Sequence, residues 1–441
     1  MPLLIAIQGV APVLLLLLPT GSPEALTLDA AQALARAQNE QVGIAAAQLD
    51  RARALRREAF SALYPSLVAS GTYTRRAQEL TRALGDTEVV LQEKNALRGQ
   101  LVAELDLFDA RAFVGLEATG HALDAQALES REIERALAFD VAGTFYLVLA
   151  AESLRGAAER RVSAAAAAVE EAKRKLEAGL FSKNEATRTE LERASAELAH
   201  TSAITGAKKA RLSLGFLLGE PIGDRPLLEP PPSPVPALAK EELDQAAEKE
   251  RADLQALRLR FEQAEAIARE PLMRLVPTLG VQGVLFASNE AGFSGREVDG
   301  YFAATITWAL FDGGERYAVR DQRLAAAEET RLRVEEKSRA IRVEVEAARL
   351  ELENARASLV QAEVRARVAA QNAEEVRVLF ASGLAGALEQ VDATASDFEA
   401  SAELVRQKAL LRVAELSLLR VLGRWPPGAG PAGGAGTGES P

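Results

Sequence analysis

The stretch WALFDGG at residues 308–314 ends a strand-like segment and begins the longest uninterrupted helical pattern in the chain. No glycine or proline follows Gly314 until Gly383. Apolar or small residues recur there at alternating steps of four and three: Ile341, Val345, Ala348, Leu352, Ala355, Leu359, Ala362, Ala366, Ala369, Ala373, Val376 and Phe380. This heptad spacing keeps one stripe of a helix against a partner. A helix over residues 314–381 would be about 100 Å long, which predicts a rod.

The same plan occurs once more, roughly 200 residues upstream, which indicates an internal duplication. Four short stretches of the second half have counterparts in the first. The pairs are LFD at 107–109 and 310–312, EAGL at 177–180 and ASGL at 381–384, LLG at 217–219 and VLG at 421–423, and LYPSL at 63–67 and LVPTL at 275–279. Each repeat is predicted to contain a helix, two strands, a long helix, a tight turn and a return helix.

The chain therefore divides into two repeats with flanking and connecting segments. The predicted parts are a signal peptide at 1–25, a first repeat at 26–219, a Pro-rich linker at 220–239, a second repeat at 240–423 and a disordered Gly/Pro-rich tail at 424–441. The leader is apolar but has no Lys or Arg before its apolar run, and a retained membrane anchor is the alternative. No other window is expected to approach 18 apolar residues.

The predicted strands span residues 67–74, 97–108, 279–287 and 301–311, and residues 75–94 are expected to form an exposed loop. Alternation separates a polar face from an apolar face. The polar side chains Arg98, Gln100, Glu104 and Asp106 are predicted to face a water-filled lumen. The apolar side chains Leu101, Leu105, Phe302, Ile306 and Trp308 are predicted to face lipid.

Four strands per chain cannot close a membrane barrel, because closure needs about eight strands or more. A bilayer does not tolerate open sheet edges, so several chains would have to share one barrel. The alternative is a small soluble sheet that caps a coiled coil.

The sequence resembles the outer-membrane efflux protein (TolC) family over nearly all of residues 26–423. The resemblance rests on LYPSL at 63–67, WALFDGG at 308–314, the turns AGL at 178–180 and SGL at 382–384, and the duplicated order of elements. It implies a mainly α-helical homotrimer with a periplasmic α-barrel and a shared 12-stranded β-barrel in outer-membrane lipid. The implied function is a passive exit channel for efflux or type I secretion. A periplasmic adaptor would couple it to an inner-membrane transporter. A non-conducting periplasmic coiled-coil scaffold is the alternative.

The resemblance also implies where functional residues lie. The two tip turns, at 179–183 and 383–387, would dock the adaptor through Gly179, Leu180, Phe181, Ser182, Gly383 and Leu384. Glu389 and Asp392 match positions whose carboxylates ring the periplasmic aperture; the alternative is that they only favour the helix dipole. Some relatives latch the closed state with an Arg in the second turn, but Ala385 stands there, opposite Glu185 of the first turn.

Composition excludes several other functions. The chain has 441 residues, a net charge of −11 and no cysteine. The negative charge disfavours a nucleic-acid partner, and the lack of cysteine excludes disulfides and thiol chemistry. His121 and His200 lie in no metal-binding motif, and Asp109 and Asp312 are predicted to be helix N-caps. We therefore predict no enzyme activity, cofactor or metal site.

Overall fold

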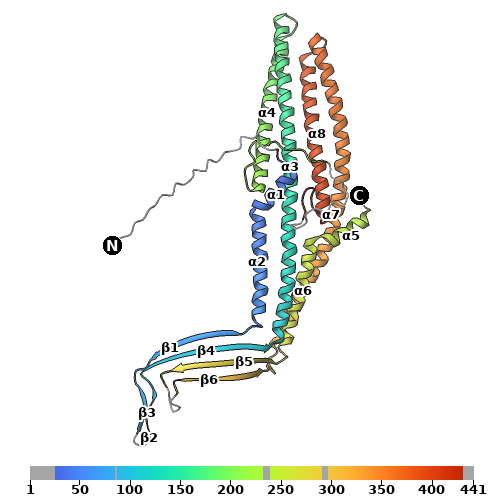
Figure 1. Cartoon of the computed structure of the whole chain (residues 1–441). Helices are drawn as coiled ribbons and strands as arrows, with labels where there is room; N and C mark the ends of the chain where they lie inside the picture. The colour runs from blue at the N-terminus through green and yellow to red at the C-terminus, as the bar shows by residue number, and fades with distance from the viewer. Residues whose placement is uncertain (1–24, 85–86, 232–238, 291–295, 431–441) are drawn as a thin grey trace, which may run out of the picture.

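The structure is a computed structural model that describes residues 25–84, 87–231, 239–290 and 296–430. A long column of helices carries a sheet that projects from one end (Figure 1). The helices are α1 (Leu28–Gln38), α2 (Glu40–Ser61), α3 (Ala110–Glu177), α4 (Lys183–Leu218), α5 (Lys240–Glu250), α6 (Ala252–Met273), α7 (Glu315–Ser382) and α8 (Ala387–Val421). The predicted leader, except for Ala25, lies outside the described residues.

The two rods, α3 and α7, are each 68 residues long. Asp109 caps α3 by accepting a hydrogen bond from the Arg111 N–H at 2.9 Å. The α7 seam residues from Ile341 to Phe380 are buried or half-buried within the single chain. The heptad pattern therefore identified both the helix and the face that packs.

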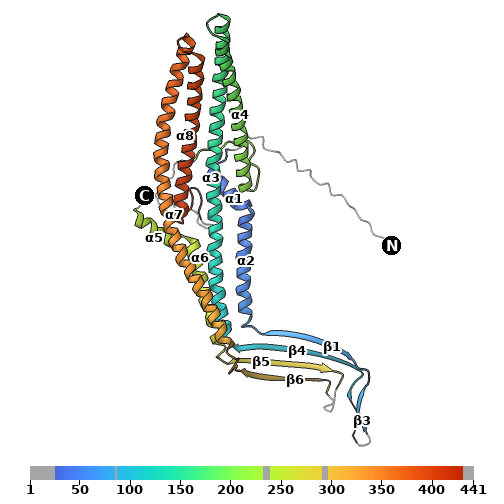
Figure 2. The same ribbon diagram turned by 180° about the vertical axis from the view of Figure 1, so that it is seen from behind.

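Apart from the short α1 and α5, the helices stand side by side in one layer (Figures 1 and 2). Near the sheet, α3 packs between α2 and α6, and α6 packs on α7. Towards the tips, α3 packs between α4 and α8, and α8 packs on α7. The order across the layer is therefore α2-α3-α6-α7 in one half and α4-α3-α8-α7 in the other. In this order α7 forms one border of the layer, and α2 and α4 form the other.

The strands are β1 (Ser66–Arg75), β2 (Leu80–Leu84), β3 (Thr87–Gln92), β4 (Asn95–Phe108), β5 (Thr278–Ser288) and β6 (Val298–Thr307). Four of them form an antiparallel sheet in the order β1-β4-β5-β6, so that both repeats contribute a hairpin. The central β4–β5 pair joins the repeats. Since strands of 10–14 residues are long enough to cross a bilayer when tilted, the lengths suit a membrane barrel.

The structure differs from the sequence predictions at several places. The expected loop at 75–94 contains a second hairpin, β2–β3. The last strand ends at Thr307 rather than Phe311. Each short helix predicted as continuous is broken, at Asn39 between α1 and α2 and at Arg251 between α5 and α6.

A hydrophobic cluster in the middle of the column joins α1, α3, α4 and α8. Its largest fully buried members include Phe145 and Leu214. It explains an apolar stretch that the sequence analysis missed: within the described residues, α3 contains an 18-residue window of mean hydropathy 1.5, of which 44% is buried. Several apolar residues of α3 from Leu137 to Val148 pack in this cluster.

The C-terminal segment also differs from its prediction of disorder. Residues 424–430 lie against α1, where the Arg36 guanidinium stacks on Trp425 at 5.3 Å and Pro426 is buried. Residues 431–441 of the predicted tail lie outside the described residues.

Candidate functional site

The first tip joins α3 to α4 through a glycine turn. Gly179 has φ of 74°, a left-handed conformation in which glycine is favoured. The Leu180 and Phe181 N–H groups donate to the Lys175 carbonyl, at 2.8 and 3.2 Å, and so satisfy the helix end. Ser182 then caps α4 in a capping box with Glu185. This bonding leaves the Leu180 side chain 74% exposed.

The second tip repeats this geometry between α7 and α8. Gly383 has φ of 81°, and the Leu384 N–H donates to the Leu379 carbonyl at 2.8 Å. Leu384 is 77% exposed, as Leu180 is at the first tip. Both tips therefore present one leucine to the outside of the column.

The two tips contact each other inside one chain. Phe181 of the first tip packs on Phe380 of the second, with ring centroids 5.5 Å apart. Ala385 is buried in the same cluster, together with Ala172 and Ala387. The position at which the family resemblance suggests an arginine is therefore filled by a small residue that packs in an apolar contact.

The predicted aperture residues lie just beyond the second tip. Glu389 and Asp392 are both exposed on the first turns of α8. The Glu389 carboxylate accepts a hydrogen bond from the Gly386 N–H at 3.2 Å, so it does serve the helix start. Asp392 lies one turn further along α8, and its side chain is exposed as well.

The sheet register places the predicted barrel residues on two opposite faces. Arg98, Gln100, Glu104 and Asp106 alternate along β4 and share one face; Glu104 is paired with Gln282. Leu101 and Leu105 share the other face with Phe302 and Ile306, because Leu101 pairs with Leu285 and Gly283 with Phe302. Trp308 lies past the end of β6, where its exposed indole donates to the Leu275 carbonyl at 3.0 Å.

Comparison with known proteins identifies the family. A model of the outer membrane efflux protein family matches residues 31–220 and 243–424. The chain belongs to the outer membrane efflux protein family. This confirms the family resemblance and the mainly helical, TolC-like fold predicted from the sequence. Among curated proteins, no sequence matches the chain.

Solved outer-membrane channels share the fold of this efflux protein. The structure of VceC from Vibrio cholerae aligns with a TM-score of 0.75 and 18% identity, over 90% of this chain and 96% of that one. CmeC from Campylobacter jejuni aligns with a TM-score of 0.77 and 13% identity, over 90% and 85%. The open state of MtrE from Neisseria gonorrhoeae aligns with a TM-score of 0.71 and 20% identity, over 90% and 89%.

In this efflux protein, charged pairs fix the corners where strands turn into long helices. Asp312 accepts hydrogen bonds from Arg316, whose Nε lies 2.8 Å away, and Arg316 also donates to the Ala309 carbonyl. Partial burial would raise the pKa of Asp312, but the hydrogen bonds from Arg316 and the backbone lower it below its ordinary value. Asp109 and Arg111 form the matching pair in the first repeat, with the same direction of shift at Asp109.

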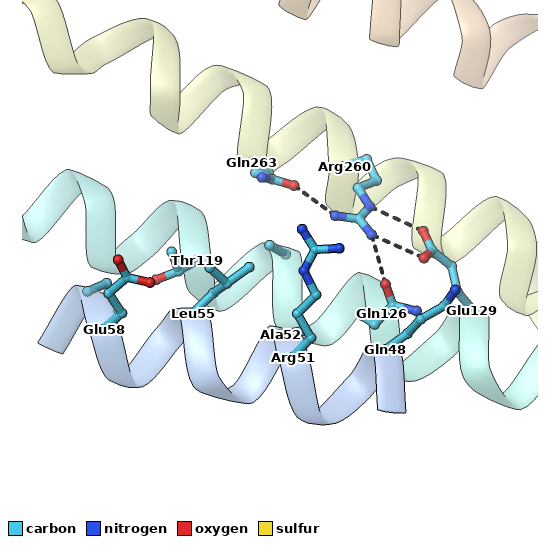
Figure 3. Close-up of a pocket in the computed structure, with 12 residues that line it drawn as sticks. Gln48, Arg51, Ala52, Leu55, Glu58, Thr119, Gln126, Glu129, Arg260 and Gln263 are labelled. Atoms are coloured by element: carbon cyan, nitrogen blue, oxygen red, sulfur yellow. Dashed lines mark hydrogen bonds and ion pairs between the residues drawn. The ribbon is translucent and has the colours of Figure 1, made fainter. Parts of the chain in front are cut away.

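A hollow of the efflux protein lies between α2 and α6, over α3 (Figure 3). It has a volume of about 680 Å³ and mixed polar and apolar walls. Arg260 of α6 donates to both carboxylate oxygens of Glu129 on α3 at 3.1 Å, and Arg51 of α2 points across the hollow. The Arg260–Glu129 pair joins the two repeats, so we interpret this hollow as part of the packing interface between them.

Proposed function

We propose that this chain is one of three identical subunits of an exit channel in which a periplasmic adaptor couples the tips to an inner-membrane transporter. Membership of the outer membrane efflux protein family supports the channel. The observation that carries the proposal is that one chain has unpaired borders in both its sheet and its helical layer.

The sheet has two open edges. Among the residues that the structure describes, no further strand pairs with the outer edge of β1 or of β6 in this sheet. Unpaired backbone N–H and C=O groups are too costly in the hydrocarbon of a bilayer. Since all four strands run antiparallel, β6 of one chain can pair with β1 of the next and close a 12-stranded barrel in a trimer.

The helical layer has matching apolar borders. Exposed apolar residues follow α7 at multiples of seven residues, on the face away from its buried seam: Val343, Leu350, Val364 and Val378. A second series follows the outer face of α4: Leu191, Leu198, Leu212 and Phe216. Both series have the spacing of a coiled-coil seam. Because the two borders differ, pairing α7 with the α4 of a neighbour is head-to-tail, which closes into a ring.

Apolar residues at the end of α4 form a surface on which a neighbouring subunit can pack. Leu212, Phe216 and Ile222 line an open apolar hollow of about 600 Å³. Leu212 and Phe216 are among the most exposed hydrophobic residues of the chain. A neighbouring α7 would cover them and remove this apolar surface from water.

Residues at the tips, at the predicted aperture and on the sheet also have roles in this channel. Leu180 and Leu384, held outward by the glycine turns, would contact the adaptor. Three copies of Glu389 and Asp392 would surround the mouth of the channel with carboxylates and favour cations. On the sheet, Leu101, Leu105, Phe302, Ile306 and Trp308 would face lipid, and Arg98, Gln100, Glu104 and Asp106 would face the lumen.

The test combines assembly with conduction. The full chain is extracted from outer membranes in detergent, its mass is measured by light scattering, and single-channel currents are recorded in planar bilayers. We expect a trimer that conducts. We expect Leu198→Glu to abolish both, because it places a charge in the apolar border between subunits.

Leu198→Met is the matched control, since it keeps an apolar side chain of similar volume at the same position of the border. It should assemble and conduct like the parent. A monomer that stays soluble without detergent would refute the shared barrel. A stable trimer without conductance at any voltage would instead favour the non-conducting scaffold.

A further inference from the structure

Lys175, in the last turns of α3, is a lysine buried at the contact between the two tips. Only 7% of its surface is exposed. Its ammonium group donates a hydrogen bond to the Phe380 carbonyl of α7 and lies over two aromatic rings, 4.5 Å from the centroid of Phe380 and 5.1 Å from that of Phe181. Glu171, one turn earlier in α3, supplies a counter-charge at 3.5 Å.

These contacts satisfy a buried charge, which would otherwise be costly. The Phe380 carbonyl lies near the C-terminal end of α7, where backbone carbonyls lack helical partners and carry partial negative charge. It already accepts a hydrogen bond from the Gly383 N–H at 3.1 Å. Since a carbonyl oxygen has two lone pairs, Lys175 can occupy the second one. Desolvated cation–π contacts with two rings add further attraction.

The equivalent residue of the second repeat shows that the helix ending does not require this lysine. The Lys175 carbonyl accepts the hydrogen bonds that close the first tip, and the Leu379 carbonyl does so at the second. The residue at this position is therefore apolar in the second repeat. In the first repeat it is a lysine, whose ammonium group reaches across to the second tip.

We propose that Lys175 is a positioning residue that ties the second tip to the first and thereby sets where Glu389 and Asp392 lie. The tie joins the two hairpins at the far end of the column from the sheet. Ala385 fits this arrangement because its small side chain packs in the same cluster. A larger side chain there would have to displace other members of this cluster, which contains Phe380 and Phe181.

The distance between the tips tests the tie directly. The chain has no cysteine, so Glu177→Cys and Ser382→Cys place two unique spin labels at exposed positions beside the tips. Pulsed electron paramagnetic resonance is recorded on full-length trimers in which one chain is labelled. We expect Lys175→Met to broaden the distance distribution about twofold, because the apolar side chain fits the cluster but cannot bond the Phe380 carbonyl.

Two further variants separate the tie from a general effect on the helix. Lys175→Arg keeps a cation and donor groups and should restore a narrow distribution. Lys173→Met removes an exposed lysine of the same turn that pairs only with Glu170 of its own helix among the described contacts, and it should match the parent. An unchanged distribution in Lys175→Met, or equal broadening in Lys173→Met, would overturn the proposal.

The proposal rests on the proposed function only for its consequence on the aperture. In a conducting trimer, we expect Lys175→Met to raise the fraction of time that the channel is open. A parent trimer that does not conduct would refute the exit channel, whereas the distance measurement would still decide whether Lys175 ties the tips.

Discussion

The two repeats share one backbone plan but stabilise it with different side chains. Both contain a 68-residue helix, and both end it in a glycine with φ between 74° and 81°. Both also interrupt the helix that precedes their strands, after a first segment of 11 residues. The backbone plan is therefore common to both repeats, and the differences lie in the groups that hold each turn.

The helix breaks show the difference most clearly. At the first break, the neutral Asn39 accepts a hydrogen bond from the Gln41 N–H at 2.9 Å and donates to the Leu217 carbonyl at 2.9 Å. At the second, Arg251 is buried and pairs with both Asp253 and Glu344. Lys337 also lies 2.9 Å from Asp253. The second repeat thus uses a charged network where the first uses one amide.

The corners where strands turn into long helices differ in the same way, because the second repeat again uses the more buried charge. Arg316 is only 2% exposed, whereas the side chain of Arg111 is 46% exposed. Buried ion pairs make a site intolerant of losing one partner, while exposed pairs contribute little. We infer that the second repeat is the more sensitive to loss of single charges, and the following experiments test this comparison.

The largest effect is expected at the tips, where the repeats should be alike. Gly179→Trp combined with Gly383→Trp should abolish export in cells that carry the cognate adaptor and transporter, because a bulky ring would cover both docking surfaces. Each change also forces a side chain into a left-handed conformation at a cost of about 1 kcal/mol. The double variant should still assemble into a trimer with the mass of the parent. Full export by the double variant would remove the tips from the docking surface.

Alanine substitutions at the two helix breaks should lower the free energy of unfolding by different amounts. Arg251→Ala should lower the free energy of unfolding by about 3 kcal/mol, because it removes a buried guanidinium and takes an ion-pair partner from the half-buried carboxylates of Asp253 and Glu344. Asn39→Ala should lower it by about 1 kcal/mol, through the loss of one cap and one hydrogen bond. Denaturant unfolding of the trimer in detergent measures both. Equal losses would contradict the proposed difference between the repeats.

The same breaks should differ in their response to acid. Burial raises the pKa of Asp253, but hydrogen bonds from Arg251 and Lys337 lower it more, so that the folded-state pKa is well below the ordinary value. Its contribution to stability is therefore complete above the unfolded pKa of about 4 and is lost as the pH falls towards the folded pKa.

We expect the difference in unfolding free energy between the parent and Asp253→Asn to shrink between pH 7 and pH 3. The corresponding difference for Asn39→Ala should stay constant, since an amide does not titrate in this range. A pH-independent difference for Asp253→Asn would show that the ion network does not stabilise the break.

The smallest effect is expected at the aperture, where the repeats differ in charge. Glu389 corresponds to Glu185, but Asp392 corresponds to the cation Arg188. Glu389→Ala with Asp392→Ala should reduce the cation preference of single channels about twofold, and Arg188→Gln should increase it. Reversal potentials in asymmetric salt measure both. Unchanged selectivity in the double variant would exclude these acids from the conduction path.

Much of the fold follows from local patterns in the sequence. The heptad spacing from Ile341 to Phe380 predicted α7 and its buried face, and the repeated Gly-Leu turns predicted both tips. Alternation along β4 predicted the two faces of the sheet, which the register with β5 and β6 extends across all four strands. These features depend on residues close in sequence, so periodicity reveals them.

Several of the features that were missed depend on residues far apart in sequence. Nothing near Arg251 marks a helix break, because the groups that stabilise it include Glu344 and Lys337 of α7. The role of Lys175 is equally hidden, since its partner carbonyl belongs to Phe380. The break at Asn39 did carry a local signal, an N-cap residue followed by Glu40, but the continuous helical pattern on both sides concealed it.

The equal length of α3 and α7 restricts how the column can change in evolution. A heptad inserted into α7 alone would shift its tip by about 10 Å past that of α3 and pull the Phe380 carbonyl out of reach of Lys175. The inserted residues would also need partners on α8, which packs on α3, and α3 in turn packs on α4. A longer channel for a wider cell envelope therefore requires matched insertions in all four helices. The length of the column can then change only by whole heptads.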